Sequence, residues 1–278
     1  MAEISAELVK TLREATNVSM MECKRALIEA EGDMEKATRL LRERGMAVAA
    51  KKASRTANQG LILSSSSPDG NMVSLVEVNC ETDFVARNPG FIAFAQDLSK
   101  RALATDGALA DAVQAEVNAK IAEIGENIVV RRNARYTLQG TGLIQNYIHL
   151  GGKVGVLLEI ACQKPETVRN PAFVEVSRDV VLHVAAANPR YLNSDEVNPA
   201  ELQAEREIYA KQVVGKPPQI VDKIVDGKIK KFYQEICLID QAFVKEPKLS
   251  IRALLEEKGK AIGDSLTIRR FVRYQLGV

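Results

Sequence analysis

The chain contains an internal duplication that constrains its fold. Residues 142–187 repeat residues 60–105 at a constant offset of 82 positions, with 13 identities in 46 aligned pairs and no gap. The identical pairs include a leading glycine (Gly60 and Gly142), a cysteine, and an Arg-Asn-Pro-x-Phe motif. Two copies of one supersecondary unit are therefore expected, packed together as related subdomains.

Each copy predicts a β-hairpin followed by a helix. In the first copy, residues 61–63 and 72–80 are predicted strands, joined by a turn at residues 67–70. Asn88 is a preferred N-cap residue and Pro89 suits the first helical position, so a helix is expected to begin there. This pattern predicts the α+β class for the core.

The segment before the duplication predicts a small helical module. Residues 1–45 show three short apolar helical patterns, and Ser19 with Glu22 forms a capping-box signature for the second. Gly45 is expected to end the third helix. Residues 46–59 then form an alanine-rich, basic connector, and the predicted core subdomains are residues 60–140 and 141–278.

The last third of the chain adds helices to the second copy. Residues 109–124 predict one further helix in the first copy, and residues 198–234 predict an antiparallel helical hairpin that projects into solvent. The hairpin turns at Gly215-Lys216-Pro217-Pro218. A short helix at 250–258 and a strand at 266–276 end the chain, with the even positions of the strand facing one way except at Arg270.

Composition excludes several functional classes. There are 38 Lys and Arg residues against 36 Asp and Glu residues, which argues against a general nucleic-acid coat. No apolar run approaches the roughly 18 residues that a membrane span needs, and the first residues do not resemble a secretory signal. Four scattered cysteines and two histidines indicate reduced thiols in a cytosolic protein, without a metal site or a cofactor.

The two copies differ most in the loop between the second strand and the helix. The first copy places Asp83 and Phe84 where the second has Pro165 and Glu166. Because both copies share a fold, the fold does not require an aromatic residue there. Two interpretations stay open: Phe84 packs into the local core, or it is an exposed wedge that enters an apolar gap in a partner, with a carboxylate beside it.

The two histidines have different predicted environments. His149 lies at the glycine-rich hairpin turn of the second copy, where a histidine is usually a tolerated turn residue. His183 lies on the long predicted helix of that copy and is interpreted as a structural partner of the packing face.

Several motifs resemble the elongation factor Ts family. Thr82-Asp83-Phe84-Val85 after Val78-Asn79-Cys80 is similar to the signature of that family. Other matches occur in order along nearly the whole chain: residues 20–27, 124–128, Tyr147-x-His149, 183–186, 215–217 and 243–247.

The resemblance implies a fold and a function. The fold is a ubiquitin-associated-like three-helix domain, a core of two repeated subdomains and a helical hairpin. The implied function is exchange of guanine nucleotide on elongation factor Tu, bound in its GDP and nucleotide-free states, in the cytoplasm. The implied function is expected to involve no covalent chemistry, no membrane and no direct nucleic-acid binding.

The resemblance also implies site residues. Thr82, Asp83, Phe84 and Val85 form the exchange-promoting loop, with Asp83 and Phe84 beside the magnesium and switch region of the GTPase. The implied partner-binding residues are Arg13, Met20, Lys24, Ile124, Gly125, His149 and Val244.

The chain departs from the family pattern in three places. Thr16-Asn17-Val18-Ser19 replaces a glycine-rich turn of many members, which affects the expected contacts of Arg13 and Met20. Lys245 stands where an apolar Met can occur. Some members continue with a helix beyond the last strand, whereas this chain stops at Val278.

Two other functions compete with nucleotide exchange. An enzyme is disfavoured because the sequence has no phosphate loop and no Ser/His/Asp set in a suggestive context. An RNA-binding translation protein is the alternative, and its support is the basic stretch 51–55 with Arg131 and Arg132.

Overall fold

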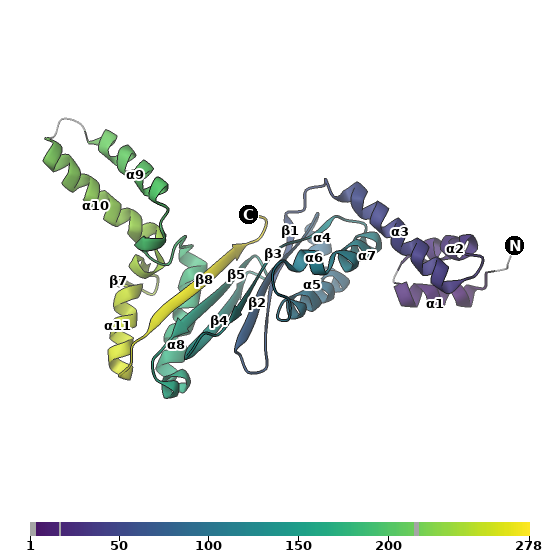
Figure 1. Cartoon of the computed structure of the whole chain (residues 1–278), viewed down its shortest axis with the longest axis horizontal. Coiled ribbons are helices and arrows are strands. Elements are labelled where there is room, and N and C mark those ends of the chain that lie inside the picture. Colours follow the sequence, from purple (N-terminus) through teal and green to yellow (C-terminus); the bar gives the residue numbers. More distant parts are fainter. Residues whose placement is uncertain (1–3, 17, 214–216) are drawn as a thin grey trace.

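The computed structural model describes residues 4–16, 18–213 and 217–278 (Figure 1). Helices and antiparallel strands are both abundant, which confirms the α+β class. Asn17 of the departing turn and Gly215-Lys216 of the expected hairpin turn lie outside the described residues.

The chain begins with three helices around a small core of their own. They are α1 (Ala6–Thr16), α2 (Met20–Glu29) and α3 (Met34–Lys52). Ser19 and Asp33 cap α2 and α3 by accepting hydrogen bonds from backbone N–H groups. The buried side chains of this core are Val9, Leu12, Cys23, Ala26, Leu27, Ala30, Ala37 and Leu41. The three helices predicted for this segment are present.

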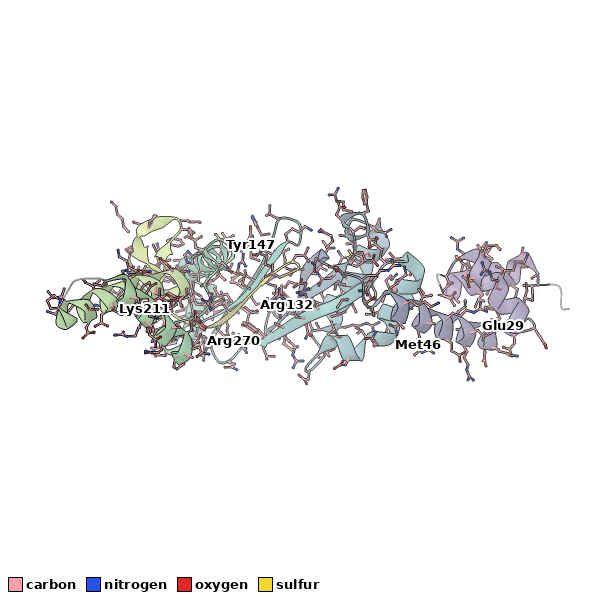
Figure 2. All side chains as sticks on the ribbon, turned by 90° about the horizontal axis from the view of Figure 1, so that it is seen from above. Glu29, Met46, Arg132, Tyr147, Lys211 and Arg270 are labelled. Atoms are coloured by element: carbon pink, nitrogen blue, oxygen red, sulfur yellow. The ribbon has the colours of Figure 1, made fainter. Side chains whose placement is uncertain are left out.

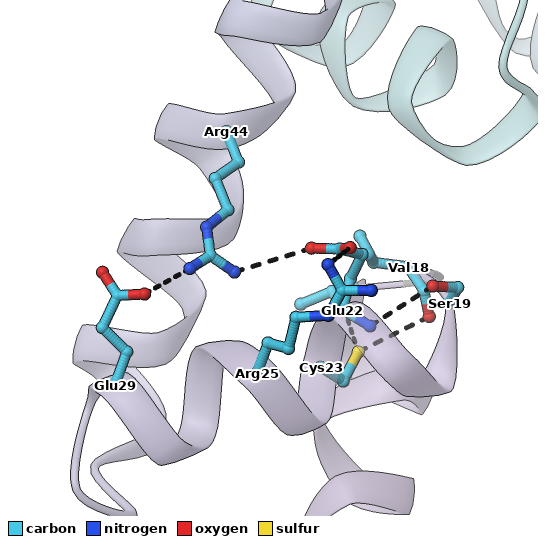
Figure 3. A network of polar contacts seen from close by, with 8 residues as sticks. Val18, Ser19, Glu22, Cys23, Arg25, Glu29 and Arg44 are labelled. Atoms are coloured by element: carbon cyan, nitrogen blue, oxygen red, sulfur yellow. Dashed lines mark hydrogen bonds and ion pairs between the residues drawn. The ribbon is translucent and has the colours of Figure 1, made fainter.

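A polar network ties α2 to α3 on the surface of this module (Figure 3). The guanidinium group of Arg44 on α3 contacts the carboxylate of Glu29 and lies 3.5 Å from that of Glu22. Arg25 lies 3.1 Å from Glu22 on the other side. Two arginines thus contact the Glu22 carboxylate. The backbone N–H of Glu22 donates to the Ser19 side chain at 3.3 Å.

The third helix does not end at Gly45, as the sequence suggested, but continues to Lys52. A glycine inside a helix costs only about 1 kcal/mol relative to alanine. The residues after it are mostly good helix formers, and Ala49 is buried in the core of the following subdomain. Residues 46–52 of the predicted connector are therefore helical, and α3 links the module to the core.

The first subdomain is a three-stranded antiparallel sheet covered by helices. Its strands are β1 (Gln59–Ser66), β2 (Met72–Cys80) and β3 (Ile128–Thr137), in that order. Its helices are α4 (Asp83–Ala86), α5 (Pro89–Arg101), α6 (Leu109–Ala112) and α7 (Gln114–Ile124). The predicted hairpin and the Asn88-capped helix are confirmed. The helix expected at 109–124 is interrupted at Val113.

The second subdomain has the same plan. Its strands are β4 (Gly142–His149), β5 (Val154–Ala161) and β8 (Thr267–Gln275), and its helices are α8 (Pro171–Ala187) and α11 (Ile251–Ile262). The glycine that leads each hairpin has a positive φ, 131° at Gly60 and 158° at Gly142. A Cβ at either position would lie 2.1 or 2.2 Å from a carbonyl oxygen of the next strand. This explains why both copies have glycine there.

The two sheets pack face to face, and helices cover their outer faces (Figure 1). The buried residues between the sheets are Ile62, Val73, Leu75, Tyr136, Leu157 and Tyr274. Gly155 on β5 allows the close approach, because a Cβ there would lie 2.4 Å from the side chain of Ile62 and 2.8 Å from that of Leu75.

The duplication extends further than the sequence analysis found. Strands β3 and β8 occupy the same place in the two sheets. Their sequences at 131–138 and 269–276 share an Arg-Arg-x-x-Arg-Tyr-x-Leu pattern. The helices before them, α7 and α11, both end at a glycine in the left-handed region, Gly125 and Gly263. The second copy is therefore the same unit interrupted by inserted elements.

A symmetric pair of buried carboxylates joins the two sheets. Glu77 and Glu159 are both fully buried. Nε of Arg132 donates to Glu77 at 2.8 Å, and Nε of Arg270 donates to Glu159 at 2.7 Å. Each arginine also lies over a tyrosine of the opposite sheet, with Arg132 4.3 Å from the ring centroid of Tyr274 and Arg270 4.1 Å from that of Tyr136.

The expectation that the even positions of the last strand face one way is wrong. Leu266 and Ile268 pack beneath the helices, whereas Tyr274 packs between the sheets with Val272 and Leu276 against it. A β-bulge is the cause, since the pairing with β5 shifts between Glu159 and Ile160. The bulge also turns Arg270 toward the buried carboxylate.

The inserted elements form the projecting hairpin and its base. Helices α9 (Pro199–Gln212) and α10 (Pro218–Ile236) extend away from the body (Figure 1). Their base is a cluster of Val197, Phe232, Ile236 and Cys237. Strands β6 (Ala242–Phe243) and β7 (Glu246–Ser250) follow, and the 3-10 helices are η1 (Pro165–Arg169), η2 (Ser194–Glu196) and η3 (Leu238–Asp240). The expected hairpin is confirmed within the described residues.

Candidate partner-binding site

The loop that distinguishes the first copy forms a one-turn helix that exposes Phe84. Thr82 caps α4, because its hydroxyl oxygen accepts a hydrogen bond from Val85 N–H at 3.3 Å. Val85 packs partly against the subdomain core, whereas Phe84 is 82% exposed. The interpretation of Phe84 as a core residue is therefore wrong, and the exposed alternative agrees with the structure.

A carboxylate from another part of the chain holds this loop. Glu126, just after the glycine that ends α7, accepts hydrogen bonds from the backbone N–H groups of Glu81 at 3.1 Å and Thr82 at 3.0 Å. It also accepts from the Thr82 hydroxyl at 2.7 Å. In return, the Glu81 carboxylate accepts from Asn127 N–H at 2.6 Å. The two segments are thus fixed to each other.

Asp83 lies beside Phe84 on the same turn. Its carboxylate forms an ion pair with Arg87 at 3.0 Å; the Arg87 side chain is largely exposed and that of Asp83 is half-exposed. Such a surface pair contributes little to stability, typically about 0–1 kcal/mol. The Asp83 carboxylate can therefore exchange Arg87 for another cation at small cost.

The second copy repeats the support of the loop without its exposed aromatic. Asp264 accepts from the backbone N–H groups of Gln163 at 3.1 Å and Lys164 at 3.0 Å, and from the Thr167 hydroxyl at 2.6 Å. These hydrogen bonds, the Thr167 hydroxyl first, lower the pKa of Asp264 to about 2. Glu166, the counterpart of Phe84, lies on η1 of this copy.

Ile124 and Gly125 lie next to the Phe84 loop. Ile124 is half-buried at the end of α7 and packs against the core of the first subdomain. Gly125 is exposed, with φ of 85°, and its carbonyl oxygen accepts from the ammonium group of Lys52 at the end of α3. The structure therefore brings these two predicted residues together with residues 82–85.

His149 is exposed at the end of β4, next to a separate exposed turn. Its Nδ1 is 2.8 Å from the Tyr147 hydroxyl at the end of β4. The next residue, Leu150, is 70% exposed and has a φ of 49°. Sequence reasoning missed Leu150, although an apolar residue before two turn glycines was a readable signal. The turn presents a histidine and a leucine to solvent.

Val244 is exposed on the turn between β6 and β7, and His183 supports that turn from below. His183 is fully buried, as the sequence analysis expected for a structural residue. Its Nδ1 accepts from Val244 N–H at 3.3 Å, and its Nε2 lies 2.9 Å from the Gln241 side-chain oxygen. Nδ1 can accept only in the neutral ring. Burial lowers the pKa of His183 below its usual 6.5.

The lowered pKa of His183 predicts a loss of stability in mild acid. Below pH 6.5 the unfolded chain takes up a proton that the folded chain resists, so stability falls as the pH falls toward the folded pKa. The slope is at most about 1.4 kcal/mol per pH unit. We expect the thermal midpoint to drop between pH 7.5 and 5.5. His149→Gln should keep this drop, and a His183→Gln variant with an unchanged drop would contradict the assignment.

The N-terminal module presents an exposed mixed stripe. Met20, Lys24 and Ile28 lie four residues apart on α2, so they share one helix face, and all three are exposed. Ile28 was not predicted, although the spacing from Lys24 was a signal for it. Arg13 is exposed on the neighbouring helix α1. An exposed apolar stripe with a central cation is typical of a protein-binding surface.

The predicted site residues lie on separate parts of a long molecule. The labelled Glu29 and Met46 lie toward one end in Figure 2, Tyr147 near the middle and Lys211 toward the other end. Glu126, the residue after Gly125, accepts a hydrogen bond from Thr82 N–H and so ties residues 124–125 to the Phe84 loop. The three-helix module, the His149 turn and the Val244 turn each add a patch of their own.

The described residues contain neither a metal-binding cluster nor a membrane-spanning helix. No three His, Cys, Asp or Glu side chains within residues 4–16, 18–213 and 217–278 are grouped to hold a metal ion. Over the same ranges, every helix is too short or too polar to cross a membrane. The four cysteines are free and buried, and burial raises the pKa of Cys80 to about 12.

Exposed apolar side chains on several elements are typical of the class of proteins that bind partners. Comparison with known proteins gives the class more narrowly. Residues 81–278 match the family model described as elongation factor TS. The chain belongs to the elongation factor Ts family, a family of translation elongation factors that are not enzymes.

Curated relatives cover almost the whole chain. Elongation factor Ts of Nitratidesulfovibrio vulgaris (strain DP4) is 43% identical over 276 residues, covering 99% of this chain and 96% of that protein. Elongation factor Ts of Clostridium perfringens (strain SM101 / Type A) is 46% identical over 287 residues, covering 99% and 93%. That of Clostridium botulinum (strain Alaska E43 / Type E3) is 42% identical over 287 residues.

Proposed function

We propose that this chain is a cytoplasmic guanine-nucleotide exchange factor that binds elongation factor Tu and promotes release of GDP. The observation that carries the proposal is Phe84, which is 82% exposed on a one-turn helix that the rest of the subdomain fixes in place. An aromatic side chain held in water by a rigid support is suited to enter an apolar gap in a partner.

The proposed mechanism needs no covalent step. A GTPase holds its nucleotide through a phosphate loop and a magnesium ion. A protein that binds the nucleotide-free GTPase more tightly than the nucleotide-bound form lowers the affinity of the GTPase for nucleotide. By reciprocity, bound nucleotide lowers the affinity of the GTPase for that protein by the same factor. In this mechanism Phe84 enters beside the switch region as a wedge, and the Asp83 carboxylate perturbs the electrostatics near the metal.

The remaining surface supplies affinity. The exposed stripe of α2 around Lys24 binds the nucleotide-binding domain, with Arg13 and Met20 beside it. Ile124, Gly125, His149 and Val244 extend the interface along the core. A broad interface of separate patches fits the need to oppose a tightly bound nucleotide, because each patch adds binding free energy to the nucleotide-free complex.

The structure favours a protein partner over RNA. Three of the five basic residues that supported the RNA-binding alternative have internal partners: Lys52 contacts the Gly125 carbonyl, Arg55 lies 3.5 Å from Glu81, and Arg132 pairs with Glu77. These cations are engaged in holding the subdomain together. An extended array of free cations would be expected for RNA binding.

The proposal predicts a nucleotide-free complex. When the chain is mixed with GDP-loaded elongation factor Tu and separated by gel filtration, the two proteins should elute together and the GDP separately. Because the coupling is reciprocal, excess GDP should dissociate the complex. Co-elution with GDP still bound at one molecule per GTPase would contradict the proposal. A matched run with RNA in place of the GTPase tests the alternative.

A further inference from the structure

We propose that Glu126 is a positioning residue for exchange, which sets the orientation of Phe84 without itself contacting the partner. This inference rests on the function proposed above and assigns a role to a residue outside the loop. It follows from the hydrogen bonds of the loop and from the comparison between the two copies of the duplicated unit.

The side chain of Glu126 determines how α4 begins. One carboxylate oxygen accepts from the backbone N–H groups of Glu81 and Thr82, at 3.1 and 3.0 Å. The other accepts from the Thr82 hydroxyl at 2.7 Å. With its hydrogen committed to Glu126, the Thr82 hydroxyl accepts from Val85 N–H at 3.3 Å. A continuous chain of hydrogen bonds thus runs from Glu126 to the residue next to Phe84.

The helix that carries Phe84 needs such external support. A helix of four residues cannot form on its own, because nucleation fixes several dihedral angles for one hydrogen bond. The side chain of Phe84 adds no packing of its own, since it is 82% exposed. Hydrogen bonds that involve a charged carboxylate are stronger than neutral ones. Glu126 therefore supplies the fixed geometry that a wedge requires.

The second copy provides an internal comparison. Asp264 makes the corresponding contacts to the backbone N–H groups of Gln163 and Lys164, and it also accepts from the hydroxyl of Thr167, which occupies the position of Val85 rather than that of Thr82. The cysteines at the ends of the second strands correspond as well, with the Cys80 sulfur 3.2 Å from the Thr82 carbonyl and the Cys162 sulfur 3.5 Å from the Lys164 carbonyl. The carboxylate that holds the loop is thus part of the shared fold, and only the first copy places an exposed aromatic side chain on that loop.

The test compares Glu126→Ala with Asp264→Ala in the full-length chain. We expect Glu126→Ala to lower the maximal rate of GDP release from elongation factor Tu about tenfold, which corresponds to about 1.4 kcal/mol. The concentration that gives half-maximal release should change less than about twofold, because the affinity patches are untouched. Glu126→Ala and Asp264→Ala should lower the thermal midpoint by similar amounts. Asp264→Ala, however, should leave the maximal rate of GDP release unchanged.

Variants of Thr82 test the route of the effect. Thr82→Ser keeps the hydroxyl and should retain near-normal release, whereas Thr82→Val removes it and should slow release. If Glu126 acts through Thr82, the losses of Glu126→Ala and Thr82→Val should not add in the double variant. Because Glu126→Ala can disturb folding, Glu126→Gln and Thr82→Val provide the same comparison with less change of shape.

The possible outcomes distinguish a failure of this inference from a failure of the proposed function. If the unaltered chain does not stimulate release, the proposed function fails. If the unaltered chain stimulates release and the Glu126→Ala variant stimulates it to the same maximal rate, only the positioning role fails. The role also fails if Glu126→Ala and Asp264→Ala slow release equally and in proportion to their thermal midpoints, since that result would indicate a general structural effect.

Discussion

Replacing Phe84 with alanine is expected to slow GDP release about thirtyfold and to leave the thermal midpoint unchanged. Phe84 is 82% exposed, so its removal leaves no cavity in the core. Loss of an aromatic anchor at an interface typically costs about 2 kcal/mol or more. At about 1.4 kcal/mol per tenfold change, this gives the expected factor. Stopped-flow release and a thermal melt of the same preparation measure the two quantities.

Two matched variants control the experiment. Phe91→Ala removes a phenylalanine of the same subdomain that is fully buried, and should cost about 3–5 kcal/mol of stability. Glu166→Ala alters the counterpart of Phe84 in the second copy and should change neither quantity. A large fall of the midpoint in Phe84→Ala, with normal release per folded molecule, would refute the wedge.

The second large effect concerns the junction of the two sheets. Arg270→Met should lower the free energy of unfolding by about 3 kcal/mol, because it removes the main cation beside the fully buried carboxylate of Glu159. The loss also removes a donor to the Thr137 carbonyl, 2.9 Å away, and the guanidinium over the Tyr136 ring. Urea unfolding of the full chain, followed by circular dichroism, measures the change.

The neighbouring arginine is the control for this prediction. Arg269 lies 3.8 Å from the same carboxylate and is 40% exposed, so Arg269→Met should cost less than about 1 kcal/mol. The double variant Arg270→Met/Glu159→Leu should recover part of the loss, since it removes the uncompensated charge. Equal costs for the two arginine variants would show that the buried pair does not hold the junction.

The duplication allowed much of the core to be predicted from the sequence. The hairpins, their leading glycines and the helices after Asn88 and Asn170 follow from local rules for turns and caps, and the structure confirms them. Strand β3 was missed, together with the continuation of α3 past Gly45. Both depend on packing against distant elements, which local preferences do not encode.

The last strand shows where periodicity fails. Its apolar residues alternate regularly in the sequence, but the bulge opposite Glu159 places the two halves on different faces of the sheet. A single extra residue moves every side chain beyond it to the opposite face of the sheet. The repeated Arg-Arg-x-x-Arg-Tyr pattern in β3 was the available signal, because it marks the same bulge in both copies.

The site was predicted in part. The contrast between Phe84 and Glu166 identified the loop, but the sequence could not decide whether Phe84 is buried or exposed. The contribution of Glu126 depends on its approach to Thr82 across 44 positions of the chain, which no local pattern reveals. Leu150 and Ile28 were missed although the turn glycines and the spacing from Lys24 were signals for them, because a single apolar residue on the surface is common and attracts no interpretation without its context.

The central claim is tested most directly by release of a fluorescent GDP analogue from elongation factor Tu. A large excess of unlabelled GDP traps the free GTPase, and the chain is added at a small fraction of the GTPase concentration. We expect release to accelerate in proportion to the amount of chain added, with many GTPase molecules emptied per molecule of chain. Release that stays at its spontaneous rate, with micromolar chain present, would contradict the account.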